Sequence, residues 1–226
     1  SRRIPIMPLS SFRPQPDPAA AAWFAGAMGQ VLLDSEADCV GAALRQRPAQ
    51  AALWLGPAAA SLPDGSEGPL PVRLHMGGAA FHGDLRCGLP LPLASDSCAV
   101  VIVQHGDASG CDQAELLAEC ARVLLPGGWL WLLALNPLSP YRLRWRGQGL
   151  RAREPVTWRK RLRAAGLAPD SLTQGIGPVW DIAADARLQD GVGLRAAFLL
   201  RAEKRRLPMT PLRKPRPLAL QAGTAA

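Results

Sequence analysis

The chain has 226 residues, of which 48% are hydrophobic and 19% charged, with a net charge of +8. This length suffices for one domain with a sizeable buried core, and the apolar fraction excludes a wholly disordered protein. No apolar run approaches the roughly 18 residues that a membrane span needs. Prolines interrupt the start of the chain, where a signal peptide needs a continuous apolar stretch. We therefore expect a cytoplasmic protein without a transmembrane segment.

The positive charge is concentrated in the second part of the chain. Residues 1–140 hold 8 Arg and 12 Asp or Glu, a net charge of −4, whereas residues 141–226 hold 18 Lys or Arg and 6 Asp or Glu, a net charge of +12. The two parts sum to +8. If the chain has an acidic partner or substrate, the residues after 140 are where we expect it to dock.

Proline content and helical spacing divide the chain into three parts. We expect an extended arm over 1–16, a single domain over 17–206 and a Pro-rich basic tail over 207–226. The domain begins with good helix formers that Asp17 can cap and Pro48 ends.

A short apolar strand is expected at 51–55, followed by a loop over 57–71 with at most one helical turn. Two weaker strands are expected at 72–76 and 78–82. Alternation of apolar residues and the flanking turn residues indicate these elements.

The clearest pattern lies in the middle of the domain. The run AVVIVQ at 99–104 predicts a buried strand, residues 112–125 predict an amphipathic helix, and the apolar run at 129–135 predicts a second buried strand. Such a β–α–β unit with continuous apolar strands indicates a parallel sheet that is covered on both faces. A further helix is expected near 155–165 and a strand at 194–202.

The five cysteines do not indicate a disulfide framework or a zinc site, because their number is odd and no CxxC pair exists. Cys98 and Cys120 fall in apolar periodic segments, which favours buried free thiols. The three histidines have no close Cys, His or carboxylate partners in the sequence, so no metal site is expected.

A set of residues in the middle of the chain matches a known family pattern: Leu91, Pro92, Asp96, Ser97, Val101, His105, Glu119, Arg122, Val123, Leu124, Pro126, Gly127 and Gly128. With these residues the chain resembles class I SAM-dependent methyltransferases of the methyltransferase type 11 group. Good matching covers about Leu89 to Arg144. The resemblance implies an α/β fold with a Rossmann-like, seven-stranded, mostly parallel sheet and helices on both faces. It also implies that S-adenosylmethionine (SAM) lies across the ends of the first strands.

The resemblance also implies positions for the cofactor-binding residues. The family's G-x-G-x-G loop aligns with Gly56, Ala58 and Ala60, and Asp84 aligns with a position that often contacts the adenine amine. Trp54 stands where the family has an acidic residue. The loop after Gly56 is rich in proline, and the second strand lacks the acidic residue that usually binds the ribose. The cofactor signature therefore departs from the family while the scaffold follows it.

Two residues at the end of the strand at 99–104 are candidates for a catalytic role. Gln104 and His105 stand where the family often positions its methyl acceptor, and His105 can act as a base near neutral pH. The alternative is a structural histidine that hydrogen-bonds to a neighbouring loop.

The basic segment offers a candidate partner site. Nine Lys or Arg and one Glu lie between Tyr141 and Arg163, with Trp145 and Trp158 interleaved. Guanidinium groups can pair with phosphates while aromatic rings stack on bases. The residues expected to contact a partner are Arg142, Arg144, Trp145, Arg146, Arg159, Lys160 and Arg161. The alternatives are a solvated helix face, packing by the tryptophan rings, or contact with an anionic membrane.

Two hypotheses for the function follow from these residues. The first is a SAM-dependent methyltransferase with an unknown acceptor. The second is a catalytically inactive binding module of the same fold, which engages an acidic partner such as nucleic acid, protein or an anionic surface through its basic C-terminal half.

Overall fold

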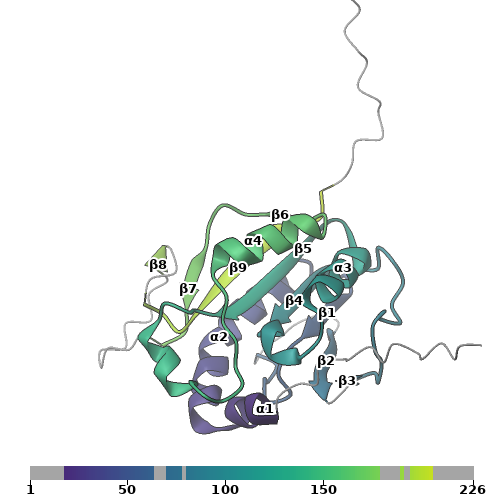
Figure 1. Cartoon of the computed structure of the whole chain (residues 1–226). Helices are drawn as coiled ribbons and strands as arrows, with labels where there is room; N and C mark the ends of the chain where they lie inside the picture. The colour runs from purple at the N-terminus through teal and green to yellow at the C-terminus, as the bar shows by residue number, and fades with distance from the viewer. Residues whose placement is uncertain (1–17, 64–69, 78–79, 179–188, 191–193, 206–226) are drawn as a thin grey trace, which may run out of the picture.

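The computed structural model of the chain describes residues 18–63, 70–77, 80–178, 189–190 and 194–205 (Figure 1). The arm expected over 1–16 and the tail expected over 207–226 lie outside these residues. None of the helices in the described ranges is long and apolar enough to cross a membrane.

The first helical segment is divided into α1 (Pro18–Ala25) and α2 (Ala27–Arg45), whereas the sequence predicted one helix. The helix is interrupted at Gly26, and α1 packs closely against the start of α2. A Cβ atom added to Gly29 would lie 2.3 Å from the Trp23 carbonyl oxygen and 2.5 Å from Phe24 Cα. The two glycines therefore allow the break, which brings Trp23 and Phe24 into the core.

The strands form one sheet with the order β3-β2-β1-β4-β5-β9-β7-β8, and β6 pairs with β9. Their bounds are β1 Ala52–Leu55, β2 Val72–Gly77, β3 Ala80–Gly83, β4 Cys98–Gln104, β5 Leu124–Leu135, β6 Ala168–Pro169, β7 Gln174–Ile176, β8 Gln189–Asp190 and β9 Ala197–Glu203. Strands β6 and β8 have only two residues each. The seven longer strands follow the order expected for a class I methyltransferase sheet, so the predicted fold class is confirmed.

The centre of the sheet is parallel, because β1 pairs in parallel with β2 and β4, and β4 pairs in parallel with β5. The edges are antiparallel. Strand β3 runs against β2, since the two residues between Gly77 and Ala80 are too few for a crossover connection. Strand β9 runs against β5.

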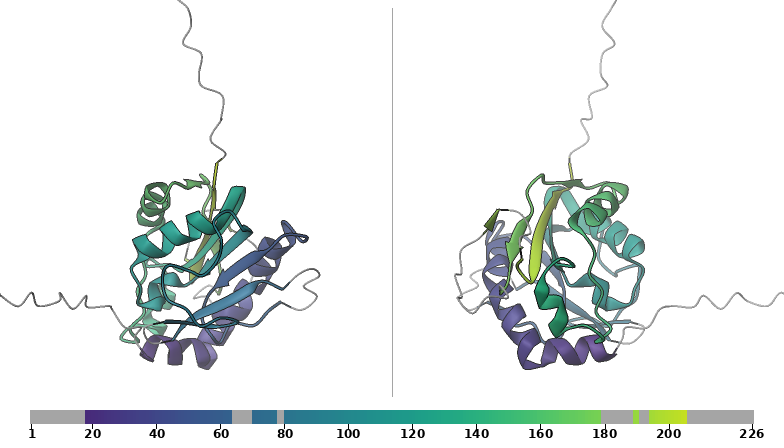
Figure 2. Two further views of the ribbon diagram at one scale, coloured as in Figure 1. Left: turned by 90° about the vertical axis from the view of Figure 1, so that its right-hand side faces the viewer. Right: turned by 60° about the vertical axis from the view of Figure 1, so that its left-hand side comes forward.

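Helices cover the two faces of the sheet (Figure 2). Helices α1 and α2 lie on one face, and α3 (Gln113–Val123) and α4 (Pro155–Ala164) lie on the other. Successive residues of a strand point to opposite faces of the sheet, so the protein has two hydrophobic cores. Val101 and Val103 pack with α3 and α4 in one core, and Trp54 and Ile102 pack with α1 and α2 in the other. The side chain of Trp54 therefore lies on the face that α2 covers.

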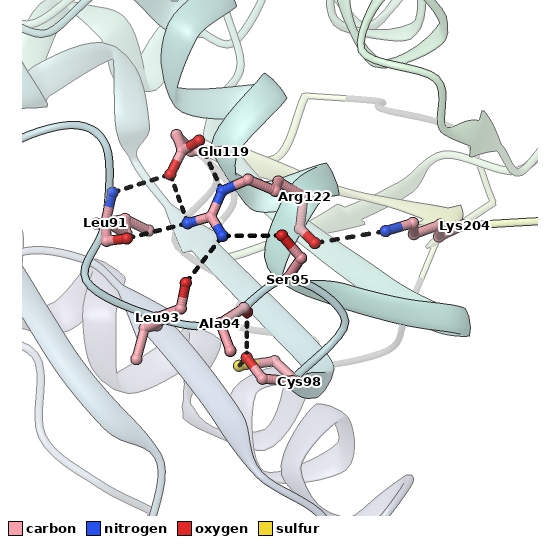
Figure 3. Close-up of polar contacts among 9 residues, drawn as sticks. Leu91, Leu93, Ala94, Ser95, Cys98, Glu119, Arg122 and Lys204 are labelled. Carbon is pink, nitrogen blue, oxygen red and sulfur yellow. Dashed lines mark hydrogen bonds and ion pairs between the residues drawn. The ribbon is translucent and has the colours of Figure 1, made fainter.

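A charged pair on α3 fastens the connection that leads into β4 (Figure 3). Arg122 Nη2 donates to Glu119 Oε2 at 2.8 Å and to the Leu91 carbonyl at 2.9 Å, and its Nη1 donates to the Leu93 carbonyl at 2.8 Å. Glu119 Oε2 also accepts from the backbone N–H of Leu91 at 2.9 Å. Leu91, Glu119 and Arg122 all belong to the motif that matches the methyltransferase pattern, so this part of the motif serves the fold.

Candidate functional site

The candidate site lies where β1 and β4 end. Both strands run parallel in the centre of the sheet, so their last residues meet at one edge. His105 follows β4 directly and occupies the N-cap position of the 3-10 helix η1 (Gly106–Ser109) without a side-chain capping hydrogen bond. Its backbone is left-handed, with φ 53°, which is strained for a residue with a side chain. Its N–H donates to the Leu133 carbonyl at 2.8 Å, which helps to hold this conformation.

Glu36 of α2 joins the two residues that the sequence proposed as catalytic. Its Oε2 accepts from Gln104 Nε2 at 2.7 Å and lies 3.0 Å from His105 Nε2. The carboxyl group is 0% exposed. His105 Nε2 donates to this oxygen in the tautomer that carries the ring proton on Nε2. Gln104 and His105 are thus brought together, and the third member of the group comes from a distant helix.

Sequence reasoning missed Glu36, although a signal was present. The buried positions of α2 include Leu32, Glu36 and Val40, which recur every four residues. A carboxylate in the apolar stripe of an amphipathic helix needs a buried partner, and Glu36 stands in that stripe.

His105 is buried, with 4% of its surface exposed, and the ring of Phe24 stacks on it at a centroid distance of 4.8 Å. Within the described residues, His105 Nδ1 and Glu36 Oε1 are buried without a hydrogen-bond partner. In this arrangement His105 is therefore shielded from solvent by α1.

Trp54 fills the end of β1, at the position where the family has an acidic residue. Its ring is 2% exposed, and its indole N–H donates to Gln104 Oε1 at 3.1 Å. The Arg73 guanidinium lies over the ring, 4.6 Å from its centroid, in a cation–π contact. The Trp54 indole thus belongs to the same buried chain of hydrogen bonds as Glu36.

Three of the four residues that the resemblance assigns to the cofactor line one pocket. Gly56, Ala58 and Asp84 border it together with Arg73, and its volume is about 180 Å³. The fourth, Ala60, is buried outside the lining, and its carbonyl accepts from the Arg73 guanidinium. Asp84 Oδ2 accepts from the backbone N–H of Arg73 at 2.8 Å. Arg73 therefore ties the loop after β1 to β2.

A second buried carboxylate, Asp107, lies in η1 close to the site. Arg153 Nε donates to its Oδ1 at 3.2 Å, and Arg161 lies 4.0 Å from the same oxygen. Burial raises the pKa of the Asp107 carboxyl above its usual range, although the two guanidinium groups act to lower it. Two arginines of the basic segment, Arg153 and Arg161, thus interact with a carboxylate of the same chain.

The aromatic residues of the basic segment do not form a surface on which bases could stack. Tyr141 and Trp145 are buried in the core beside α1 and α2, and Trp158 is buried in the opposite core. The expectation that Trp145 contacts a partner is corrected by this burial, since only 8% of its surface is exposed. The two halves of the segment are anchored on opposite faces of the sheet.

The basic side chains that were predicted to contact a partner differ in their contacts within the chain. Arg159 donates to Thr173 Oγ1 at 2.6 Å and to the Ser171 carbonyl at 2.7 Å, and so fastens α4 to the following loop. Arg142, Arg144, Arg146 and Lys160 are exposed.

The cysteines are free, and Cys98 and Cys120 are buried as predicted. Burial raises the pKa of both thiols, so neither is a ready nucleophile. Within the described residues, no group of three or more Cys, His, Asp or Glu is placed to hold a metal ion.

Comparisons with known proteins agree with this architecture. No protein-family model and no curated protein matches the chain. Among solved structures, it is similar to a SAM-dependent methyltransferase of Thermotoga maritima described as a possible histamine N-methyltransferase. The TM-score is 0.55 at 16% identity, over 81% of this chain and 94% of that one.

A second similar structure is a chain from the complex that contains the Haloferax volcanii Trm112 methyltransferase activator. The TM-score is 0.50 at 17% identity, over 83% of this chain and 98% of that one. At such identities the likeness concerns the fold. The chain has the class I SAM-dependent methyltransferase fold.

Proposed function

We propose that this chain is a methyltransferase-fold binding module that does not use SAM. The observation that carries the proposal is the packing of Trp54 at the end of β1. A buried indole under the Arg73 guanidinium replaces the acidic residue that the family has there. The sulfonium and ammonium groups of SAM are cationic, so a cation in place of an anion disfavours their binding.

The size of the pocket supports the same proposal. Its volume of about 180 Å³ lies below the roughly 300 Å³ at which small-molecule sites begin. In addition, the described residues between β1 and β2, 56–63 and 70–71, contain no helix whose N-terminal amides could face the cofactor carboxylate. The small pocket and the lack of such a helix in these described residues therefore support a module that does not use SAM.

A second candidate function is methyl transfer from SAM to an unidentified acceptor. It is favoured by the common pocket of Gly56, Ala58 and Asp84. It is also favoured by the place of Gln104, whose Oε1 would lie 3.1 Å from a Cβ atom added to Gly56. In this case the acceptor would bind beside the pocket, and Gln104 and His105 would need to be uncovered to contact it.

Thermal unfolding of the full chain with SAM or S-adenosylhomocysteine distinguishes the two functions. A ligand at about 100 times its Kd stabilises the folded state by about 2.7 kcal/mol, which raises the Tm measurably. We expect an unchanged Tm up to millimolar ligand, with adenosine and methionine as controls. A Tm that rises with SAM but not with adenosine would overturn the binding-module proposal and favour the methyltransferase.

A further inference from the structure

Exposed apolar side chains gather beside the 3-10 helix η2 (Pro140–Arg144), which follows β5. Nine large apolar side chains are exposed in the described ranges, and four of them belong to α2 or to the chain around η2. These four are Met28, Val31, Leu138 and Leu143.

Direct contacts bring these two segments together. The Tyr141 hydroxyl donates to the Met28 carbonyl at 3.3 Å, and Arg144 Nη1 lies 3.8 Å from Met28 Sδ. The Trp23 indole N–H donates to the Arg144 carbonyl at 3.1 Å. Val31 lies one helical turn after Met28, on the same side of α2. The right-hand view of Figure 2 shows the short 3-10 helix η2 beside α1 and α2.

Arginines are frequent in the segment that carries Leu138 and Leu143. Residues 137–151 contain four arginines and no Asp or Glu. Arg142 and Arg146 have no carboxylate within ion-pair distance in the described part of the chain. We define the α2–η2 patch as Met28, Val31, Leu138 and Leu143 together with Arg142, Arg144 and Arg146.

An exposed apolar surface rimmed by charged residues marks interaction sites on soluble proteins. The composition of the α2–η2 patch indicates which kind of partner fits. Arginine and methionine are enriched in protein–protein interfaces, guanidinium groups pair with carboxylates through two hydrogen bonds, and methionine adapts its shape to a partner. Leu138 and Leu143 are the most exposed apolar side chains of the α2–η2 patch, at 69% and 59% of their surface. They would therefore gain most from burial by a partner.

We propose that the α2–η2 patch docks an acidic protein segment that also carries apolar side chains, such as an amphipathic helix. This inference rests on the proposed function as a binding module and names its surface and the chemistry of its partner. The carboxylates of the segment pair with Arg142 and Arg146, and its apolar side chains cover Leu143 and Met28.

A protein segment suits the α2–η2 patch better than nucleic acid or a membrane. Single-stranded nucleic acids are bound on exposed aromatic rings, and membrane surfaces are contacted through exposed Trp and Tyr. Here Tyr141 and Trp145 are buried. The exposed side chains of the α2–η2 patch are instead aliphatic, thioether or guanidinium groups.

Selection of random peptides displayed on phage against the full chain tests the proposal. We expect the enriched peptides to combine Asp or Glu with large apolar residues. A synthetic copy of one enriched peptide is then titrated by fluorescence anisotropy. The double variant Arg142→Glu and Arg146→Glu should weaken binding about tenfold or more, as expected for interface arginines. Leu143→Ser should weaken it as well.

A matched control reverses two exposed arginines outside the α2–η2 patch, Arg86→Glu and Arg163→Glu, and should leave the affinity within about twofold. Circular dichroism confirms that each variant is folded. Enrichment of no acidic peptide, or equal loss of affinity in the control, would overturn the proposal. Binding of phosphatidylserine vesicles or a single-stranded oligonucleotide that needs Arg142 and Arg146, without peptide binding, would overturn it too.

The two proposals fail separately. If SAM raises the Tm while an acidic peptide binds the α2–η2 patch, the proposed function is overturned and the docking surface stands. If SAM has no effect and no peptide depends on the α2–η2 patch, only the docking surface is overturned.

Discussion

Glu36 and His105 form a buried pair that links α2 to the end of β4. Glu36 Oε2 lies 3.0 Å from His105 Nε2, and the same oxygen accepts from Gln104. Gln104 in turn accepts from the Trp54 indole, so the hydrogen bonds run from β1 through β4 to α2. Because the Glu36 carboxyl is inaccessible to solvent, these donors replace its hydration.

Loss of the Glu36 carboxyl should destabilise the fold strongly. In Glu36→Ala both Gln104 and His105 lose their acceptor, and each buried donor left without an acceptor costs about 1–3 kcal/mol. Urea unfolding measures this free energy. Asp34→Ala, at an exposed position of the same helix, is the control and should change it by less than about 0.5 kcal/mol. Equal effects of the two variants would contradict the structural role of Glu36.

Removal of the Trp54 donor should have a smaller effect. Trp54→Phe keeps an aromatic ring at the end of β1 but leaves Gln104 Oε1 buried without a donor, which costs about 1–3 kcal/mol. Urea unfolding again provides the free energy. Trp129→Phe is the comparison, since Trp129 is only partly buried and packs at the border of the same core. If both variants lose equal stability, the hydrogen bond to Gln104 has no special role.

Acid should weaken the contact between Glu119 and Arg122. The hydrogen bond from Arg122 holds the pKa of the Glu119 carboxyl below its usual range, which is about 4.3. The contact therefore adds stability above that usual value, and this stability is lost as the pH falls through the lower folded-state pKa.

Glu119→Gln should accordingly be less stable than the natural chain near neutral pH. The difference should shrink in acid, where the natural Glu119 is itself protonated. Urea midpoints measured between about pH 7 and pH 3 follow the difference. Glu115→Gln, on the exposed side of the same helix, serves as the control. A difference that stays constant with pH would rule out the ionised contact.

The break between α1 and α2 predicts a specific effect of a methyl group. Gly29→Ala places Cβ 2.3 Å from the Trp23 carbonyl oxygen, so α1 must shift. Such overpacking costs about 1–3 kcal/mol. At Gly88, a Cβ atom would meet nothing within 4 Å, so Gly88→Ala is a matched control. Thermal unfolding of the two variants should give a lower Tm only for Gly29→Ala, and equal Tm values would show that α1 does not pack tightly here.

The sequence predicted the centre of the fold well because its signals there are local. The apolar run at 99–104 and the helix after it became β4 and α3 with shifts of one or two residues at their ends. The Asp112 side chain caps α3 by accepting from the Ala114 N–H at 2.8 Å, as its position before the helix suggested. The family resemblance then supplied the order of the strands, which no local pattern contains.

The candidate site was less predictable, because its key contacts join residues far apart in the chain. Glu36 contacts His105 only after α2 packs on the sheet, and the residues near either one in the sequence do not identify the other as its partner.

In the basic segment, by contrast, the local pattern was clear but fitted more than one function. Its alternation of Arg with aromatic residues left both a nucleic-acid contact and packing by the tryptophan rings as alternatives. In the structure Trp145 and Trp158 bury apolar area in two separate cores.

Calorimetric titration of the full chain with SAM tests most directly whether Trp54 and Arg73 have closed the cofactor site. We predict no saturable heat up to millimolar SAM. Even a Kd of about 1 mM requires a binding free energy of about −4.1 kcal/mol, which we do not expect from a closed site. Saturable binding with one site per chain and a Kd well below that value would contradict the closed site.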